Sequence, residues 1–230
     1  MTSTPISLIA IGAALVAISG CDTVGGRADA FADAYNKVAA DFALANVNST
    51  LPTSGQASYS GLAMVAASAN MNNDVFDSYV GTSEFTASFN NAGGNISGKM
   101  SDFAVREMVA NNDPDAKPFF DSLSQLDSTT TTQTAASIAA FFSEGELANG
   151  EITVEETAFG NNGAFTPKLQ GELQHGTTTL VVSGNGNGIL GGNQANVVAV
   201  VGGTALQNGF AMTRNGVNAL GLAAAIATKD

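Results

Sequence analysis

Two residues that could do chemistry occur once each in the chain, His175 and Cys21. One histidine and one cysteine exclude histidine-rich metal centres, intramolecular disulfides, CxxC redox pairs and cysteine-rich zinc sites, and they disfavour a histidine-based catalytic triad. His175 stands between Gln174 and Gly176, a setting typical of a hairpin end. A haem ligand would need an apolar cleft around it, so we expect His175 to be an exposed turn residue.

A group of carboxylates is the next candidate for chemistry: Glu144, Glu146, Glu151, Glu155 and Glu156. Paired carboxylates can perform acid–base catalysis or hold Ca²⁺. No Asp-x-Asp-x-Gly spacing accompanies them. We therefore expect a solvated strand face and predict no metal site.

Methionine and glycine supply the remaining candidates. Met64, Met100 and Met108 are soft potential ligands, but methionine more commonly fills a core. The glycine-rich stretch 184–188 is followed by no Lys-Ser/Thr and opens no helix, so it does not fit a phosphate-binding loop. No Gly-x-Ser-x-Gly motif occurs. The sequence predicts a protein that is not an enzyme and carries no cofactor, and it specifies no cofactor-binding residue.

The charge of the chain restricts its partners. Eight basic residues stand against 20 acidic ones, for a net charge of −12. Such a chain lacks the basic surface that displaces counterions from nucleic acid, so nucleic acid is excluded as a partner. Eleven of the acids lie within 102–156, opposed only by Arg106 and Lys117. Solubility on an anionic cell surface explains this region best, and steering of a basic partner is the alternative.

Cys21 closes an apolar N-terminal segment. Residues 1–20 carry no charged side chain, and Ile6 to Ile18 is interrupted only by Ser7 and Gly12. Thirteen residues are too few to span a bilayer comfortably but fit the apolar core of a secretory signal. The ending Ile-Ser-Gly-Cys resembles the bacterial lipobox, in which the cysteine is acylated and becomes the first mature residue. We predict lipidation of Cys21; a plain signal peptide and a buried helix remain alternatives.

The rest of the chain changes from helical to strand periodicity. Phe31, Tyr35, Val38 and Phe42 recur at helical spacing and predict a helix over 27–44. From residue 57 the apolar period is two. The hairpin 84–90/95–103, with its turn at Asn90 to Gly94, is the clearest pair. The predicted strands are 57–65, 84–90, 95–103, 141–148, 151–158, 167–174, 177–183, 195–202 and 205–214.

Short strands joined by glycine turns predict a mainly β fold: a closed antiparallel up-and-down barrel of about eight strands. Closure removes edges that would otherwise aggregate. The predicted domains are a signal peptide (1–20), an anchor and helix (21–50), a barrel (51–216) and a C-terminal tail (217–230). Residues 105–140 lose the alternation and predict a partly helical insertion that faces a partner. A cap that completes the core is the alternative for this insertion.

Four segments in order resemble the barrel domains of the transferrin-binding protein B family: 51–61 (LPTSGQASYSG), 85–98 (FTASFNNAGGNISG), 188–203 (GILGGNQANVVAVVGG) and 210–214 (FAMTR). From the first to the last, they span about 51–214, most of the mature chain. Leu190 replaces the usual aromatic residue of the third motif, and the insertion 105–140 departs from the family pattern. Transferrin receptors of this family have two lobes, each with a handle and a barrel. This chain has room for one lobe at most, so transferrin itself is not the expected ligand.

The resemblance implies a monomeric lipoprotein of the outer membrane of Gram-negative bacteria, displayed on the cell surface. It would be held by its lipid and would bind a host or environmental protein, haem or another solute without catalysis. The alternative function is a structural, envelope-maintenance lipoprotein without a soluble ligand. Alternative locations are a periplasm-facing anchor and the inner membrane.

Overall fold

The computed structural model describes residues 23–45, 50–68, 75–109, 131–205 and 209–230. Two helices accompany the strands within these residues, α1 (Val24–Ala45) and α3 (Thr131–Ser143). The strands are β1 (Gly55–Ser68), β2 (Val75–Asn90), β3 (Gly93–Val109), β4 (Glu146–Leu147), β5 (Asn149–Phe159), β6 (Ala164–Phe165), β7 (Lys168–His175), β8 (Thr178–Asn185), β9 (Asn187–Gly191), β10 (Val197–Gly203), β11 (Ala211–Arg214) and β12 (Val217–Lys229).

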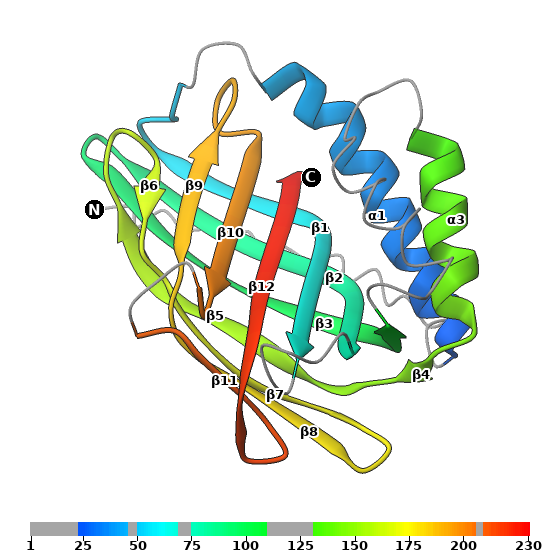
Figure 1. The fold of residues 1–230 in the computed structure, drawn as a ribbon. Coiled ribbons are helices and arrows are strands. Elements are labelled where there is room, and N and C mark those ends of the chain that lie inside the picture. Colours follow the sequence, from blue (N-terminus) through cyan, green and yellow to red (C-terminus); the bar gives the residue numbers. More distant parts are fainter. Residues whose placement is uncertain (1–22, 46–49, 69–74, 110–130, 206–208) are drawn as a thin grey trace, which may run out of the picture.

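The strands form a closed barrel, which confirms the predicted fold class (Figure 1). β7 pairs with β8 and β6 with β9, and β8 and β9 pair in turn with β11 and β10. Both β10 and β11 pair with β12, each along a different part of that strand. β12 then pairs with β1 from Tyr59↔Lys229 to Ser68↔Leu220 and closes an antiparallel barrel of 8 strands. Most successive strands along the chain are neighbours in the sheet, and the longest connection, from β3 to β4, contains α3.

One phase of the alternation fills the barrel interior. Tyr59, Phe85, Phe89 and Ile96, which the sequence places together, are all buried in the same core cluster. Aromatic side chains from β3, β5 and β6 complete that cluster with Phe103, Phe159 and Phe165. The interior is therefore packed by side chains, as expected for a barrel of this strand number.

The predicted β2–β3 hairpin is confirmed, with its turn at Asn91–Ala92. Asn90 accepts a hydrogen bond from the Ala92 amide through its side-chain oxygen at 2.8 Å. Gly93 follows with φ of 125°, and an added Cβ would lie 1.9 Å from the Phe159 carbonyl oxygen. This position therefore requires glycine, both for its backbone angle and for the close approach of β5.

The two helices lie side by side against the outer face of the barrel beside β1, β2 and β3 (Figure 1). Phe31, Tyr35 and Val38 are buried, as the helical spacing predicts, in a second cluster with Ile138 and Phe142 of α3. Leu62, Val80, Ala104 and Met108 supply the outer-face side chains of the barrel to the same cluster. The outer face of these strands is thus apolar because helices cover it.

Basic side chains fasten the helices to the barrel. Arg27 donates hydrogen bonds to the carbonyls of Phe103 and Ala148 at 2.9 and 2.6 Å. Lys37 reaches Ser60 at 2.7 Å and the side chain of Asp230 at 2.8 Å. These contacts fix the first turn of α1 near β3 and β5, and its middle near the ends of β1 and β12.

Several predicted boundaries are wrong: β2 begins at Val75 and not at residue 84, and β11 begins at Ala211 and not at residue 205. The expected insertion starts too early, because β3 continues to Val109, and the expected strand 141–148 is split between the end of α3, a turn and β4. Residues 131–143 form α3, whose Ile138, Phe141 and Phe142 are buried. The described part of the insertion is therefore packed on the scaffold, and 110–130 lies outside the described residues.

A further correction concerns residues 217–230, which the sequence assigns to a tail. Residues 217–229 form β12, the strand that closes the barrel. Its inward positions are the small residues Ala219, Ala223, Ala225 and Ala227, all buried. The outward positions are also apolar or small, so the strand lacks the alternation that marks half-buried strands.

Candidate functional site

Charged side chains meet inside one end of the barrel, which we call the Asp77 end. Here β1 and β3 finish, β2 begins, and the hairpins β7–β8 and β11–β12 turn. The Asp77 carboxylate accepts hydrogen bonds from Arg214 Nε at 2.5 Å and Nη2 at 3.1 Å. Asp77 is 1% exposed and Arg214 21%. A bidentate ion pair between arginine and a carboxylate is among the stronger polar interactions in proteins.

His175 belongs to the same cluster, so its expected place as an exposed turn residue is wrong. It is the last residue of β7, and its side chain is 13% exposed. Its Nε2 lies 3.7 Å from Asp77 Oδ2, and its Nδ1 lies 3.6 Å from Glu146 Oε2. The Tyr79 ring packs edge-on against the imidazole at 5.6 Å. Both ring nitrogens therefore face carboxylates.

The contacts within the cluster lower the pKa of Asp77 and raise the pKa of His175. Burial alone would raise the pKa of Asp77, but the positive charges of His175 and Arg214 outweigh it and hold that pKa below its ordinary value. The facing carboxylate of Asp77, helped by Glu146, raises the pKa of His175 against the opposing effect of burial. The charged forms of both groups are therefore favoured in the folded protein.

This arrangement predicts a stability maximum in the acid to neutral range. His175 stabilises the fold fully below its unfolded pKa of 6.5, and this contribution is lost as the pH rises through its higher folded pKa. Asp77 contributes above its ordinary pKa of 3.8 and loses this as the pH falls through its lower folded pKa. We expect the free energy of unfolding, measured with urea, to fall as the pH rises above 6.5 and through the higher folded pKa of His175. Replacing His175 by Gln should remove that part of the slope; an unchanged slope would contradict the coupling.

The contacts of this cluster connect three strands. Arg214 donates hydrogen bonds to both oxygens of the Asp77 carboxylate, and each His175 nitrogen faces a carboxylate oxygen. Within the described residues there is no group of three or more His, Cys, Asp and Glu side chains placed to hold a metal ion. The three residues tie β2, β7 and β11 together across the end of the barrel.

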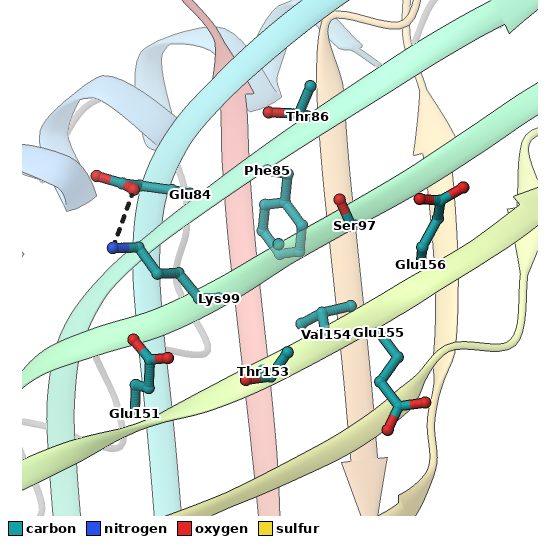
Figure 2. A pocket seen from close by; sticks show the side chains of 11 residues that line it. Glu84, Phe85, Thr86, Ser97, Lys99, Glu151, Thr153, Val154, Glu155 and Glu156 are labelled. Carbon is teal, nitrogen blue, oxygen red and sulfur yellow. Dashed lines mark ion pairs between the residues drawn. The ribbon is translucent and has the colours of Figure 1, made fainter. Parts of the chain in front are cut away.

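A shallow depression of about 430 Å³ lies on the outer face of β2, β3 and β5 (Figure 2). Four glutamates and a lysine line it: Glu84, Glu151, Glu155, Glu156 and Lys99. The β3–β5 pairing shifts register between Ile96 and Gly98. This bulge leaves the consecutive residues Glu155 and Glu156 both exposed to solvent.

Two of these glutamates are neutralised locally and two are not. Glu84 lies 3.4 Å from Lys99, the pair marked by the dashed line in Figure 2, and Glu155 lies 2.8 Å from Lys168. Glu151 and Glu156 have no ion-pair partner among the described residues. The depression therefore carries net negative charge on a rigid surface of three paired strands.

The other predicted chemical residues take the places expected of them. Met100 and Met108 are fully buried, Met100 in the barrel core and Met108 in the helix-facing cluster, and Met64 is partly buried beside the same cluster. Glu144 and Glu146 are exposed near the start of β5. Cys21 lies outside the described residues.

A second feature of the outer face is apolar. A groove of about 300 Å³ runs between β9, β10 and β12, lined by side chains that include Ile189, Val201 and Ile226. Ile189 is 50% exposed and the neighbouring Leu222 40%. Apolar side chains that remain open to water mark surfaces suited to contact with other molecules.

The described residues form a closed barrel with α1 and α3 on its outer face. Comparison with models of known protein families, with curated proteins and with solved structures finds no match in any of the three. Neither α1 nor α3 combines the length and apolar character that a membrane-spanning helix needs.

Proposed function

We propose that this chain is a lipid-anchored, non-catalytic binding protein of the bacterial outer membrane that engages an extracytoplasmic ligand through the exterior of its barrel. One observation carries the proposal: the barrel interior is occupied by its own aromatic and aliphatic side chains. A ligand carried inside the barrel would need an apolar cavity. A packed barrel instead offers its outer face and loops, held rigidly by the strands.

The charge of the exterior favours a basic ligand. The depression on β2, β3 and β5 carries Glu151 and Glu156, which have no ion-pair partner in the described part of the chain, and the whole chain has a net charge of −12. Negative potential of this kind accelerates the approach of a positively charged partner and discriminates against an acidic one. We therefore propose a protein segment or solute with several positive charges as the ligand of this depression.

A paired substitution tests the ligand site. The Glu151→Gln/Glu156→Gln variant should bind a lysine-rich peptide, used as the probe, with about fivefold lower affinity, near 1 kcal/mol, in low-salt calorimetry. The matched control is Asp29→Asn/Asp33→Asn, which removes the same charge from exposed positions of α1. Equal weakening by the control would show that net charge alone acts, and the site assignment would be wrong.

The anchor is tested by Cys21→Ser, for which we expect release of the protein from membranes or its accumulation as an unprocessed precursor. The cysteine thiol is the group that takes the diacylglyceryl thioether, and two or three acyl chains are needed for durable attachment. Membrane fractionation and intact-mass measurement give the readout. A Ser variant that fractionates and migrates like the parent would overturn the anchor.

A further inference from the structure

Helix α1 begins almost directly after the proposed lipid anchor. Thr23 caps the helix: its hydroxyl accepts a hydrogen bond from the Gly26 amide at 3.0 Å, and its carbonyl accepts one from the Arg27 amide at 3.1 Å. Such a cap fixes the helix start, since it satisfies amides that have no partner in the first turn. The helix then starts at Val24. Only two residues separate Cys21 from it.

This spacing leaves no room for a flexible tether. The three Cα-to-Cα steps from Cys21 to Val24 span at most about 11 Å even when the chain is fully extended. The first turn of α1 is itself fastened to the barrel through Arg27, which bonds to the carbonyls of Phe103 and Ala148. An acylated Cys21 would therefore hold the start of α1 within about 11 Å of the anchor, and the barrel wall lies beyond it by the reach of the Arg27 side chain.

The fastening point identifies which end of the barrel is held. Ala148 stands two residues after Glu146, whose carboxylate lies 3.6 Å from His175 Nδ1 at the tip of the β7–β8 hairpin. Arg214, just before the β11–β12 turn, contacts Asp77 in the same cluster. In Figure 1 the start of α1 and β4 lie low on the right of the barrel, and both hairpins turn at the bottom. The anchor is thus next to the Asp77 end.

From this geometry we infer that the Asp77 end of the barrel faces the lipid surface, while the opposite end points away from it. This inference rests on the proposed function, because it requires acylation of Cys21. We call the opposite end the Asn91 end, after the tip of the β2–β3 hairpin. The lipid surface is the partner of the Asp77 end, and the Asn91 end and the outer face remain free for the ligand.

The two hairpin tips at the Asp77 end suit an approach to lipid headgroups. The β7–β8 tip is Gly176–Thr177, and the β11–β12 tip is Asn215–Gly216 followed by Val217, which is 60% exposed. None of these residues carries a charge that would have to be desolvated. Glu107 and Glu146 are 60% and 67% exposed nearby. Because these acids are repelled by anionic lipid, the short anchor and not electrostatic attraction sets the orientation.

Single engineered thiols test the orientation on the full-length acylated protein. Since Cys21 is the only cysteine and its sulfur would be in a thioether, Thr177→Cys and Asn91→Cys each supply one free thiol. Both positions are exposed turn residues, so neither substitution removes a buried contact. Each variant is inserted in phosphatidylcholine vesicles and labelled from outside with a bulky maleimide. Protein expressed without residues 1–21 serves as the free reference.

We expect the Thr177→Cys variant to label about an order of magnitude more slowly on vesicles than in free protein, and the Asn91→Cys variant to label equally fast in both. A flexible Gly/Ser segment of twenty or so residues, inserted after Cys21, should restore fast labelling at position 177. Equal labelling of the two variants on vesicles, with acyl mass present on Cys21, would overturn the orientation alone. Absence of acyl mass on Cys21 would overturn both the orientation and the proposed anchor.

Discussion

Replacing Arg214 by Met should lower the free energy of unfolding by about 3 kcal/mol, because it leaves a buried carboxylate without its main partner. Asp77 is 1% exposed and receives both donors of the Arg214 guanidinium. Breaking a fully buried pair by removing one member costs about 3–5 kcal/mol, and the partial exposure of Arg214 places the effect at the lower end. Urea unfolding monitored by circular dichroism measures the change.

The reverse substitution, Asp77→Asn, should cost less, about 1–2 kcal/mol. Arg214 is 21% exposed and also lies 3.6 Å from Glu107. In the Asp77→Asn variant its guanidinium therefore stays in contact with solvent and with a second carboxylate. The double variant Asp77→Asn/Arg214→Met should then be more stable than Arg214→Met alone, since no unpaired carboxylate remains. A double variant as unstable as the sum of the two single ones would contradict this account.

Acidification supplies an independent check of the same pair. Loss of Arg214 removes one of the charges that depress the pKa of Asp77. Protonation then neutralises the Asp77 carboxylate, which keeps only His175 of its two basic neighbours, at a higher pH than in the wild type. The stability gap between the two proteins should therefore narrow as the pH falls. A gap that stays constant from neutral to acid pH would show that lost packing, and not the unpaired charge, destabilises the Arg214→Met variant.

The alternation of large apolar residues with small or polar ones predicted the barrel, because it is clearest in the strands whose inward side chains are large. On β1, Tyr59 stands between small residues. On β2, Phe85 and Phe89 alternate with exposed or small residues, and a glycine-containing turn follows. Local patterns of this kind depend on the side chains of one strand alone. They therefore identify the strands of a hairpin without any knowledge of the distant chain.

The closing strand could not be found in this way, because both of its faces are apolar or small. Ala223, Ala225 and Ala227 are buried in the interior cluster, while Leu222 and Ile226 face outward. Alanine is also disfavoured in strands on average. The partner strands β1 and β10 decide the conformation of β12, and this information lies far away in the sequence.

The charged cluster escaped prediction for a related reason: its members are brought together only by closure of the barrel. Asp77 and Arg214 are 137 residues apart. A signal was nevertheless present in each strand. Asp77 precedes Tyr79 by two positions, His175 follows Leu173 by two, and Arg214 follows Met212 by two. Each charge thus continues the inward phase of its own strand, which indicates a shared interior end once a barrel is assumed.

Phe89→Ala should destabilise the barrel by about 3–5 kcal/mol, the cost typical of removing a large buried aromatic side chain. Phe89 is 7% exposed, belongs to the interior cluster, and meets the Phe159 ring edge-on at 5.6 Å. The cavity left behind cannot collapse easily, because β2 is paired on both sides, with β1 and with β3. Chemical denaturation of the protein without residues 1–21 measures the loss.

Thr86 on the same strand provides the matched control. Its side chain faces outward and is exposed, so Thr86→Ala should change the free energy of unfolding by no more than about 0.5 kcal/mol. The difference between the two variants isolates the inward phase of β2 from the effect of shortening any side chain on that strand. A loss below about 1 kcal/mol for Phe89→Ala would place this ring outside a tightly packed core. An interior that tolerates such a deletion would have room for a small ligand, and the assignment of binding to the exterior of the barrel would then be wrong.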